Sequence, residues 1–404
     1  MSAVTKIDML GLSTRAFARR GLSSSAALAS DALAPLDPSR MTVTRNPAPK
    51  APPDNAALKG MFGKIFSDHM FVCDHVAGEG WGAPAIVPHG PLALSPASMA
   101  LHYALQCFEG MKAYRGDDGV VRLFRPDLNA ARMTSSLERL RMPTFEAVAF
   151  VECLKALLRE DAGWVPSGDG HSAYLRPTAI ATDPFLGVGE PSETKLFCIL
   201  SPVGPYYANG FDPIAVYADS SNVRAWPGGA GNTKIGGNYA PSIKPARDAA
   251  DATGGAAQQV LYLFGDDHRV TEVGAMNVFV LWETPYGTRE LVTAPLDYGD
   301  ILPGVTRRSV IELARAEGAV EVAERPFTMR EVKRAADEGR LLEVFGAGTA
   351  AVICPINRIF YEGDAIDVPT GADIGPVAQS FWQKLSDIHY GRVDSPWAVP
   401  VDDL

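Results

Sequence analysis

Apolar residues recur along this chain with two different spacings, and the spacing predicts where helices and strands lie. Steps of three and four residues place apolar side chains on one face of a helix, and they occur in seven segments: 98–108, 126–140, 145–162, 240–252, 306–317, 329–338 and 376–391. Short apolar runs bounded by Gly, Pro and polar residues predict strands at 174–180, 196–201, 214–217, 259–264, 277–282 and 290–293.

Three further segments predict strands through their turns. Residues 61–73 are typical of a hairpin or a strand pair, and 81–94 of a loop and a strand punctuated by Gly and Pro. Residues 109–115 and 120–124 flank a Gly-Asp-Asp-Gly turn, which predicts a β-hairpin.

The order of these elements predicts an α+β protein with two domains, because strands and helices mix without a regular strand–helix–strand alternation. We expect a small α+β domain over 58–204 and a connector rich in Gly and Pro at 205–212. We expect the larger domain, over 213–404, to contain a closed or barrel-like mixed sheet. Residues 31–57 contain six prolines in their first 23 positions and little periodicity, which favours a disordered linker or arm.

The first thirty residues differ in composition from the rest of the chain. Arg15, Arg19 and Arg20 lie among serines and alanines, and Asp8 is the only acidic residue before Asp31. Such a composition is typical of an organelle transit peptide. The segment predicts a cleaved mitochondrial presequence and a matrix protein; the alternative is a disordered tail on a cytoplasmic protein.

Composition and charge argue against nucleic acid, a membrane or a metal ion as a partner of this chain. The chain has 404 residues, 47% of them hydrophobic, and a net charge of −10, which argues against a nucleic-acid-binding surface. No apolar run reaches the ~18 residues that a membrane helix needs, so we expect no membrane partner. The five cysteines form no close pair, and no His or Cys cluster has the spacing of metal ligands, so we expect no metal.

One lysine lies between two groups of glycines. Lys234 follows Gly228, Gly229 and Gly231 and precedes Gly236 and Gly237, with Tyr239 close behind. Glycines this dense allow the backbone to bend sharply or to approach a ligand closely. An amine in a partly desolvated pocket has a lowered pKa and can attack an aldehyde. Lys234 is therefore a candidate Schiff-base lysine; the alternative is a solvated glycine-rich loop.

A lysine that holds pyridoxal phosphate needs an acid for the pyridine nitrogen and a cradle for the phosphate. Glu272, between a polar stretch and an apolar strand, is the candidate acid. Val305 and Thr306 follow a Pro-Gly turn, where a helix would begin and offer free N–H groups to a phosphate. Residues 345–350 form a second glycine-rich turn that contains Thr349, and Arg132, on the helix predicted over 126–140, is a candidate cation.

Aromatic and cationic residues at the ends of predicted elements are candidates for recognising an amino-acid substrate. They are Tyr103, Phe108, Tyr174, Arg176 and Tyr206. For each of them, packing in a core or between domains is the alternative.

These motifs occur in a fixed order, and together they resemble one enzyme family. The motifs are residues 101–114, Tyr174-Leu-Arg-Pro177, Lys234-Ile-Gly-Gly-Asn-Tyr239, 271–277, Leu302-Pro-Gly-Val-Thr306 and Gly346-Ala-Gly-Thr-Ala350. From about Leu58 to the C-terminus the chain resembles the branched-chain amino acid aminotransferases of eukaryotic type, within fold type IV of the pyridoxal phosphate enzymes. This resemblance implies a smaller α/β sandwich, a larger pseudo-barrel and an active site at their interface.

The resemblance also implies roles for individual residues. Lys234, Tyr239 and Glu272 match the catalytic positions, and the cofactor-binding positions are these three with Arg132, Arg224, Val305, Thr306 and Thr349. The substrate-binding positions are Phe62, Tyr103, Phe108, Tyr174, Arg176, Tyr206, Ala275, Ala350, Leu186 and Val188. In this family the loop with Leu186 and Val188 reaches into the neighbouring subunit's site, which implies a homodimer.

One departure concerns regulation. Animal members carry a Cys-x-x-Cys pair after the Gly-Thr-Ala turn, proposed as a redox switch, whereas this chain has Ala351 and Cys354. A thiol switch needs two sulfurs, so we expect that regulation to be absent.

The expected reaction is reversible amino transfer from L-leucine, L-isoleucine or L-valine to 2-oxoglutarate. Two alternatives remain at this point. One is another fold type IV activity, such as D-amino acid transamination or aminodeoxychorismate lysis. The other is a catalytically silent binding or scaffold protein, whose mark would be loss of the lysine or the acid.

Overall fold

The structure is a computed structural model that describes residues 33–205 and 212–402. Its contacts separate residues 1–33 from residues 34–404, and only the second group is described below. The expected transit peptide, residues 1–30, lies outside the described residues.

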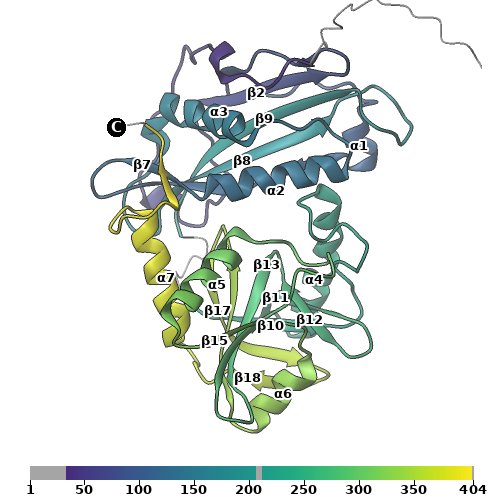
Figure 1. Cartoon of the computed structure of the whole chain (residues 1–404), viewed down its shortest axis with the longest axis vertical. Coiled ribbons are helices and arrows are strands. Elements are labelled where there is room, and N and C mark those ends of the chain that lie inside the picture. Colours follow the sequence, from purple (N-terminus) through teal and green to yellow (C-terminus); the bar gives the residue numbers. More distant parts are fainter. Residues whose placement is uncertain (1–32, 206–211, 403–404) are drawn as a thin grey trace, which may run out of the picture. The chain divides into compact units, whose positions relative to one another are not determined.

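Two β-sheets organise the described chain after Ala34 (Figure 1). Strands of the first sheet follow the order β1-β4-β2-β9-β8-β6-β7-β19, with β3 beside β2 and β5 beside β8. Their bounds are β1 Thr42–Val43, β2 His69–Val76, β3 Gly80–Trp81, β4 Ala85–Pro88, β5 Gln106–Phe108, β6 Met111–Arg115, β7 Val121–Phe124, β8 Ser172–Ala181, β9 Glu193–Val203 and β19 Ala398–Pro400.

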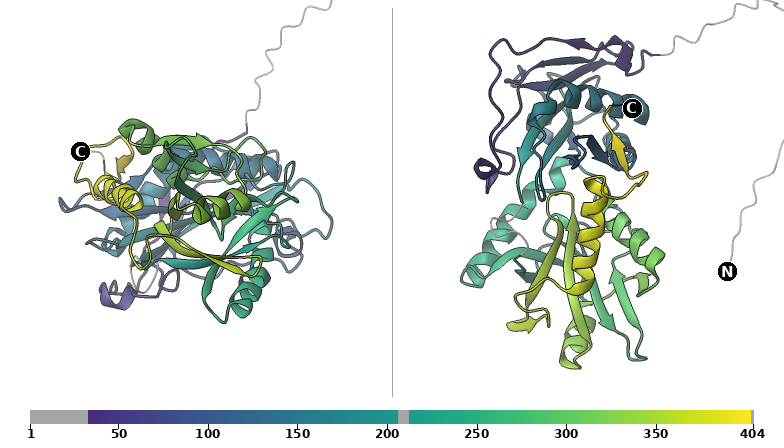
Figure 2. Two further views of the ribbon diagram at one scale, coloured as in Figure 1. Left: turned by 90° about the horizontal axis from the view of Figure 1, so that it is seen from below. Right: turned by 90° about the vertical axis from the view of Figure 1, so that its left-hand side faces the viewer.

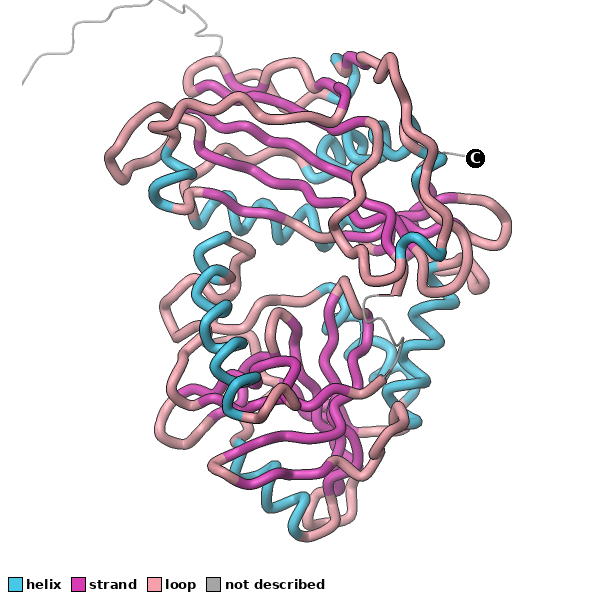
Figure 3. Tube along the Cα trace, turned by 180° about the vertical axis from the view of Figure 1, so that it is seen from behind, coloured by secondary structure: helices cyan, strands magenta, loops and turns pink. Residues whose placement is uncertain are grey.

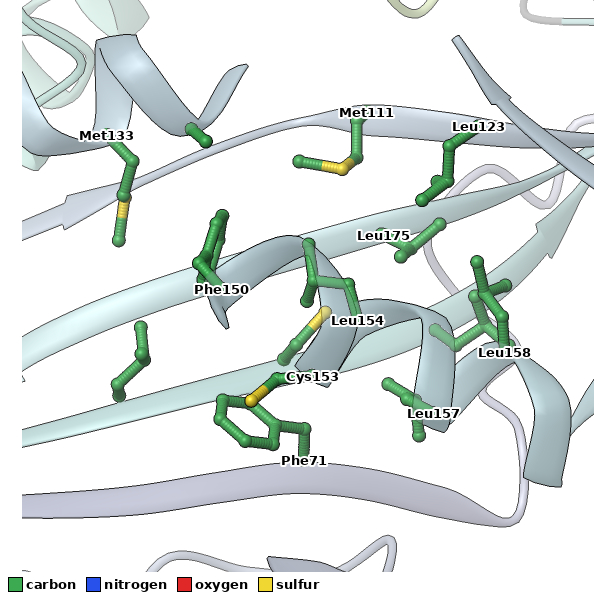
Figure 4. Close-up of a cluster of buried hydrophobic side chains, with 14 of the residues drawn as sticks. Phe71, Met111, Leu123, Met133, Phe150, Cys153, Leu154, Leu157, Leu158 and Leu175 are labelled. Carbon is green, nitrogen blue, oxygen red and sulfur yellow. The ribbon is translucent and has the colours of Figure 1, made fainter. Parts of the chain in front are cut away.

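Helices α1 (Met99–Tyr103), α2 (Pro126–Arg139) and α3 (Ala147–Glu160) belong with this sheet. Helices α2 and α3 each carry apolar side chains along one face, and this face packs against the strands of the sheet. Figure 4 shows the resulting core, in which Phe150 and Leu154 of α3 face Phe71 of β2 and Leu175 of β8. This core fixes the strand ends and the face of α2 that reach the site described below.

Strands of the second sheet form a closed ring, because β12 at one end of the order β12-β11-β10-β17-β16-β13 also pairs with β13. The sheet continues through β14 and β15, and β18 pairs with β17. Figure 3 shows the strands gathered into two separate groups, one for each sheet. Their bounds are β10 Ile214–Asp219, β11 Ala257–Phe264, β12 Arg269–Val273, β13 Met276–Glu283, β14 Arg289–Thr293, β15 Glu321–Glu324, β16 Leu341–Gly348, β17 Val352–Tyr361 and β18 Asp364–Asp367. The predicted α+β fold with a barrel-like second sheet is confirmed.

Four helices accompany the second sheet: α4 Ile243–Ala252, α5 Val305–Glu317, α6 Met329–Asp337 and α7 Pro376–His389. Helix α7 packs on β16 and β17 (Figure 2). The buried Glu343 of β16 accepts the N–H groups of Val377 and Ala378, at 2.9 Å each, at the start of α7. These carboxylate contacts satisfy donors that the first turn of a helix leaves free.

Several predicted elements differ in the structure. The helix expected over 98–108 ends at Tyr103, because Ala104 has a left-handed φ of 52° and the next residues form β5, paired with β8. Residues 62–65 form turns and a bend, and of the hairpin or strand pair expected over 61–73 the structure has one strand, β2, which begins at His69.

The glycine-rich turn expected at residues 345–350 is mostly strand, since β16 continues through Gly348. A Cβ at Gly346 or at Gly348 would come within 3.0 Å of the Met276 side chain on the neighbouring strand β13. Glycine at these two positions therefore allows close packing of β16 against Met276, and the turn itself is shorter than predicted.

The expectation of a disordered arm is wrong for residues 33–57. Leu36 is buried, β1 pairs with β4, and Ala34 bridges Gly80. A Cβ at Gly80 would lie 2.4 Å from the backbone of Ala34, so glycine permits this approach. Also unlike the expectation, the end of the chain leaves the second sheet, because β19 pairs with β7 in the first.

Candidate active site

Lys234 lies on the loop between β10 and α4, and both groups of its backbone are hydrogen-bonded. Its N–H donates to the hydroxyl of Ser136 on α2 at 2.8 Å, and its carbonyl accepts the N–H of Phe108 at 3.0 Å. The amine Nζ is 3.0 Å from the hydroxyl of Tyr239 and 4.7 Å from the centre of the Phe108 ring. The amine is thus placed between two aromatic side chains contributed by different parts of the chain.

Two of the glycines around Lys234 allow the backbone of the loop to pass close to neighbouring residues. A Cβ at Gly231 would lie 2.5 Å from Ala225 and 2.7 Å from the carbonyl oxygen of Asp300. One at Gly236 would lie 2.6 Å from the side-chain amide of Gln106. At Gly231 a larger residue would meet backbone and would displace the loop, whereas at Gly236 it would require the Gln106 side chain to move. Close approach is the reason predicted from the sequence for these glycines.

Burial changes the acid–base properties of both groups in this pair. Burial lowers the pKa of Lys234 to about 8; the positive charge of Arg132 lowers it as well, and the negative charge of Glu109 opposes this. Burial raises the pKa of Tyr239 to about 12. Near neutral pH the phenol therefore keeps its proton, and a larger fraction of the lysine is neutral than for an exposed lysine.

Glu272 lies on β12 and is 1% exposed. Its Oε2 is 2.6 Å from Nη1 of Arg224, and its Oε1 accepts from the side-chain amide of Asn277 at 3.1 Å. The contact with Arg224 is an ion pair without the angles of a hydrogen bond, so Oε2 has no hydrogen-bond donor. Burial raises the pKa of Glu272 and the charge of Arg224 opposes that rise.

The start of α5 forms a second part of the site. Gly304 precedes the helix, and no side chain caps its first N–H groups. A Cβ at Gly304 would lie 2.0 Å from Oδ1 of Asn277, so only glycine fits here. Free N–H groups and the positive end of the helix dipole favour an anion at this position, as predicted for Val305 and Thr306.

A cavity of about 410 Å³ connects these groups. It is lined by Phe62, Phe108, Gly110, Arg132, Tyr174, Arg176, Lys234, Tyr239, Gln259, Ala275, Met276, Asn277, Leu302, Gly304, Val305, Thr306 and residues 347–351. Both sheets contribute to the lining, and Lys234, Arg176 and the first residues of α5 all line the same cavity.

Arg176 on β8 is surrounded by aromatic rings. Its guanidinium carbon lies 4.9 Å from the centre of the Phe108 ring and 5.2 Å from that of Tyr174. Its Nη2 donates to the Tyr174 hydroxyl at 3.4 Å, and its buried Nε has no hydrogen-bond partner. Phe62 packs edge-on to Tyr174, with ring centres 5.0 Å apart. A cation with a free donor thus lies within an aromatic wall.

The structure does not bring every predicted site residue to this cavity. Twelve line it: Phe62, Phe108, Arg132, Tyr174, Arg176, Lys234, Tyr239, Ala275, Val305, Thr306, Thr349 and Ala350. Glu272 and Arg224 do not line it but are joined to it through Asn277. Tyr103, Leu186 and Val188 lie apart from it and are exposed, and the Tyr103 hydroxyl donates to the carbonyl of Leu186. Tyr206 lies outside the described residues.

Sequence reasoning missed Glu109, Asn277 and Gln259. Gln259 and Asn277 line the cavity, while Glu109 is fully buried and holds Arg132. Glu109 and Asn277 belong to motifs that the resemblance uses, so their place in those motifs was the available signal. Gln259 has no such signal, since it lies in an apolar strand.

In residues 33–205 and 212–402, no three or more His, Cys, Asp or Glu side chains are grouped so that they could hold a metal ion. No helix in the same ranges has the length and apolar character needed to cross a membrane.

Comparison with known proteins agrees with this geometry. Residues 106–359 match the family model described as amino-transferase class IV. A branched-chain-amino-acid aminotransferase of Monosiga brevicollis is 50% identical over 367 residues, covering 91% of this chain and 93% of that protein. The mitochondrial enzyme of that name from Rattus norvegicus is 46% identical, covering 90% and 91%. Relatives with cytosolic names also occur, as in Ovis aries at 44% identity over 89% and 92% of the two chains.

Solved structures show the same fold. The Escherichia coli branched-chain amino acid aminotransferase is 26% identical with a TM-score of 0.66, covering 82% of this chain and 99% of that one. The chain therefore belongs to the class IV aminotransferases, in the family of the branched-chain-amino-acid aminotransferases. Enzymes of this class use pyridoxal phosphate, and a solved member, 26% identical, contains pyridoxamine 5′-phosphate.

Proposed function

We propose that this protein transfers the amino group of L-leucine, L-isoleucine or L-valine to 2-oxoglutarate, with pyridoxal phosphate bound to Lys234. The observation that supports this most directly is the buried amine of Lys234, 3.0 Å from Tyr239, in a cavity shared with Arg176 and the start of α5. The names of the relatives support the choice of substrate.

The residues present fit the cofactor at both of its ends. The free N–H groups at the start of α5, with Thr349 and Arg132, would hold the phosphate. Glu272, which is joined to the cavity through Asn277, would be the acidic partner of the pyridine nitrogen, and the charge of Arg224 would favour its ionised form against burial. Tyr239 would donate to the phenolic oxygen of the ring. When bound, the cofactor supplies an aldehyde and a ring that withdraws electrons from the substrate's α-carbon.

Lys234 would hold the cofactor covalently and then move the proton. Once it no longer holds the cofactor, the neutral amine of Lys234 would take the proton from the substrate's α-carbon, and the ammonium so formed would then donate a proton, so that one group acts as base and then as acid. A pKa of about 8, lowered by burial, suits a group that must do both near neutral pH. The enclosing rings of Phe108 and Tyr239 limit the access of water to the amine.

Substrate selection would combine the aromatic wall with Arg176. Phe62, Phe108 and Tyr174 offer apolar surface to a branched side chain, and the free Nε of Arg176 offers a donor to the carboxylate of glutamate. With leucine bound, the guanidinium would remain against the rings and the Tyr174 hydroxyl, where it already lies. One pocket could then accept both an apolar and an acidic side chain.

Steady-state assays test the proposed reaction. We expect L-leucine, L-isoleucine and L-valine to react with 2-oxoglutarate by a ping-pong scheme, and the purified protein to show a visible absorption band. Turnover of D-alanine in place of L-leucine would assign a different class IV activity. Absence of both the band and turnover would indicate a silent binding protein.

Replacing Arg176 by methionine should affect glutamate more than leucine. Methionine keeps apolar volume but removes the donor, so kcat/KM for L-glutamate should fall by about 10- to 100-fold, as for ~1.5–3 kcal/mol lost with a hydrogen bond to a charged group. For L-leucine the change should be several-fold smaller. Arg308→Met, at an exposed guanidinium on α5, is the control. Equal losses for the two substrates would remove Arg176 from this role.

We also propose that the protein is a homodimer. Exposed apolar side chains gather on α1 and the loop after β8, namely Leu101, Tyr103, Phe185, Leu186 and Val188. The bond from Tyr103 to the carbonyl of Leu186 and the bridge between Ser98 and Pro184 join these two segments into one surface. Exposed apolar patches of this kind favour association, and a second copy is the partner implied by the family resemblance.

Sedimentation measures this association. The wild-type chain should sediment with twice the mass of one chain, and Leu186→Asp with Val188→Asp should shift it towards the monomer because two charges would enter an apolar interface. The control is Val148→Asp, at a valine on α3 that is 77% exposed, and it should leave the mass unchanged. A monomeric wild type would refute the proposal.

We propose a mitochondrial location, with residues 1–30 as the transit peptide. Support comes from the Arg- and Ser-rich composition of that segment and from the mitochondrial relative. Mass spectrometry of the N-terminus of the protein from isolated mitochondria tests it, and recovery of the intact chain from the cytosol alone would favour the alternative, a cytoplasmic protein.

A further inference from the structure

Glu109 is a buried carboxylate behind Arg132, a residue that lines the cavity, and the proposed mechanism gives it no role. It follows β5, and its side chain is completely buried. Its Oε1 accepts Nε of Arg132 at 2.7 Å, and its Oε2 accepts Nη2 of Arg132 and Nδ2 of Asn129, both at 2.8 Å. The N–H of Gly110 donates to the same Oε2 at 3.2 Å. A carboxylate is rarely buried this completely unless it is paired and hydrogen-bonded, as Glu109 is here.

These contacts fix the orientation of Arg132. A guanidinium has five N–H donors in one plane. Two of those of Arg132 are engaged by Glu109, and a third, on Nη1, donates to the carbonyl of Pro303 at 3.1 Å. Two N–H groups, one on each terminal nitrogen, remain for a ligand. Pro303 directly precedes Gly304 and α5, so the same guanidinium links α2 to the start of the helix that would hold the phosphate.

The charges of Glu109 and Arg132 also indicate that Glu109 holds Arg132 in place. Arg132 lowers the pKa of Lys234 and Glu109 opposes this effect. Without Glu109, the guanidinium would be free to turn towards Lys234 and its charge would be uncompensated in a buried site. A buried pair with a bidentate geometry keeps the cation in place.

We propose that Glu109 is a positioning residue for the cofactor's phosphate: it holds Arg132 against the start of α5, so that the two halves of the phosphate site are assembled before the ligand arrives. The inference rests on the proposed function, because it takes the anion at α5 to be the phosphate of pyridoxal phosphate. It adds a residue that does not touch the ligand and acts through Arg132.

The test compares two ligands that differ only in the phosphate. Apoprotein of the full chain is titrated with pyridoxal phosphate and with pyridoxal, for the wild type and for Glu109→Gln, which keeps the size of the side chain and removes its charge. The affinity for pyridoxal phosphate should fall by about tenfold or more, as is typical when a partner that orients a ligating group is lost. The affinity for pyridoxal should change by less than ~threefold. Equal losses for both ligands, or no loss for either, would overturn the proposal.

A double substitution shows whether Glu109 acts through Arg132. Arg132→Met should remove most of the preference for the phosphorylated ligand. Adding Glu109→Gln to it should lower that preference no further, because the two changes remove one unit. Independent, multiplying losses would mean that Glu109 does not act through Arg132 and would overturn the proposal.

The visible band of the loaded enzyme gives a readout that a purely structural role would not move. The groups that influence Lys234 are Arg132, Glu109, Tyr174 and Arg176, and Tyr239 is in hydrogen-bond contact with it. Of these, Glu109 supplies negative charge, so its removal should shift the pH midpoint of the band to lower pH. An unchanged midpoint in folded Glu109→Gln protein would contradict the electrostatic part of the proposal.

A second variant covers the case in which Glu109→Gln does not fold. Asn129→Ala removes one donor to Glu109 Oε2 and keeps both charges, so it should cause a smaller loss in the same direction, for pyridoxal phosphate only. A loss shared with pyridoxal would overturn the proposal here too. Failure of the proposed function can be told apart from failure of this inference, because in the first case the wild type itself would bind neither ligand at Lys234.

Discussion

Lys234→Ala protein should have no visible absorption band, and its kcat with L-leucine should be lower by about 10⁴-fold or more. The amine lies within hydrogen-bond distance of Tyr239, and a primary amine can both hold the cofactor covalently and carry a proton. Absorption spectroscopy and single-turnover measurements check the two parts separately. Small primary amines added to the solution should restore part of the rate, since they can replace the missing base.

Lys244→Ala is the matched control, because this lysine is exposed at the start of α4 and pairs with Asp248. It should leave the spectrum and kcat unchanged. A pH series of the apoprotein adds a further check: burial lowers the pKa of Lys234 to about 8, so the rate of its reaction with pyridoxal phosphate should rise with pH and level off above about pH 8. A normal band in Lys234→Ala would exclude this residue from its role.

Glu272→Gln should lower kcat by about 10²–10³-fold, the usual effect of removing one preorganised electrostatic partner from an active site. An amide keeps the volume of the side chain but cannot keep a proton on the pyridine nitrogen, and it leaves Arg224 without its counter-charge. Affinity for the phosphate should change little, since Glu272 lies on β12 and not at the start of α5. The measurement is kcat with L-leucine, together with the affinity of the apoprotein for pyridoxal phosphate.

Glu290→Gln provides a control at another ion-paired glutamate on a strand of the same sheet. Glu290 lies on β14, pairs with Arg325 and accepts from the indole of Trp282. Its replacement should lower the free energy of unfolding and leave kcat unchanged. If Glu272→Gln retained kcat within threefold of the wild type, the pyridine nitrogen would need another partner.

The site was predictable to the extent that its residues lie in short motifs. Glycine density drew attention to Lys234, and the structure gives the reason, since Gly231 and Gly236 lie against neighbouring backbone and side chain. The burial of Glu109 was not predictable, because its partner Arg132 is on another element and Pro303 is 171 positions from Arg132. Which acid in a motif becomes buried depends on such distant contacts.

The fold was predictable where one spacing dominates. Helices α2, α5 and α7 were expected close to their observed bounds because their apolar residues repeat over three or more turns. Strand β16 was misjudged because glycine is typical of turns, whereas Gly346 and Gly348 make room for Met276. Pairing of residues from 33 to 57 with β4 and Gly80 depends on partners that periodicity does not reveal.

The return of β19 to the first sheet has a mechanical consequence. The chain passes between the two sheets after β9 and again before β19, so two covalent links join them. A single link would let one half swivel about it, whereas two links leave mainly a hinge about the line that connects them. Opening and closing of the cavity between Arg176 and α5 should therefore follow one axis, and cutting the chain between α7 and β19 should release a second.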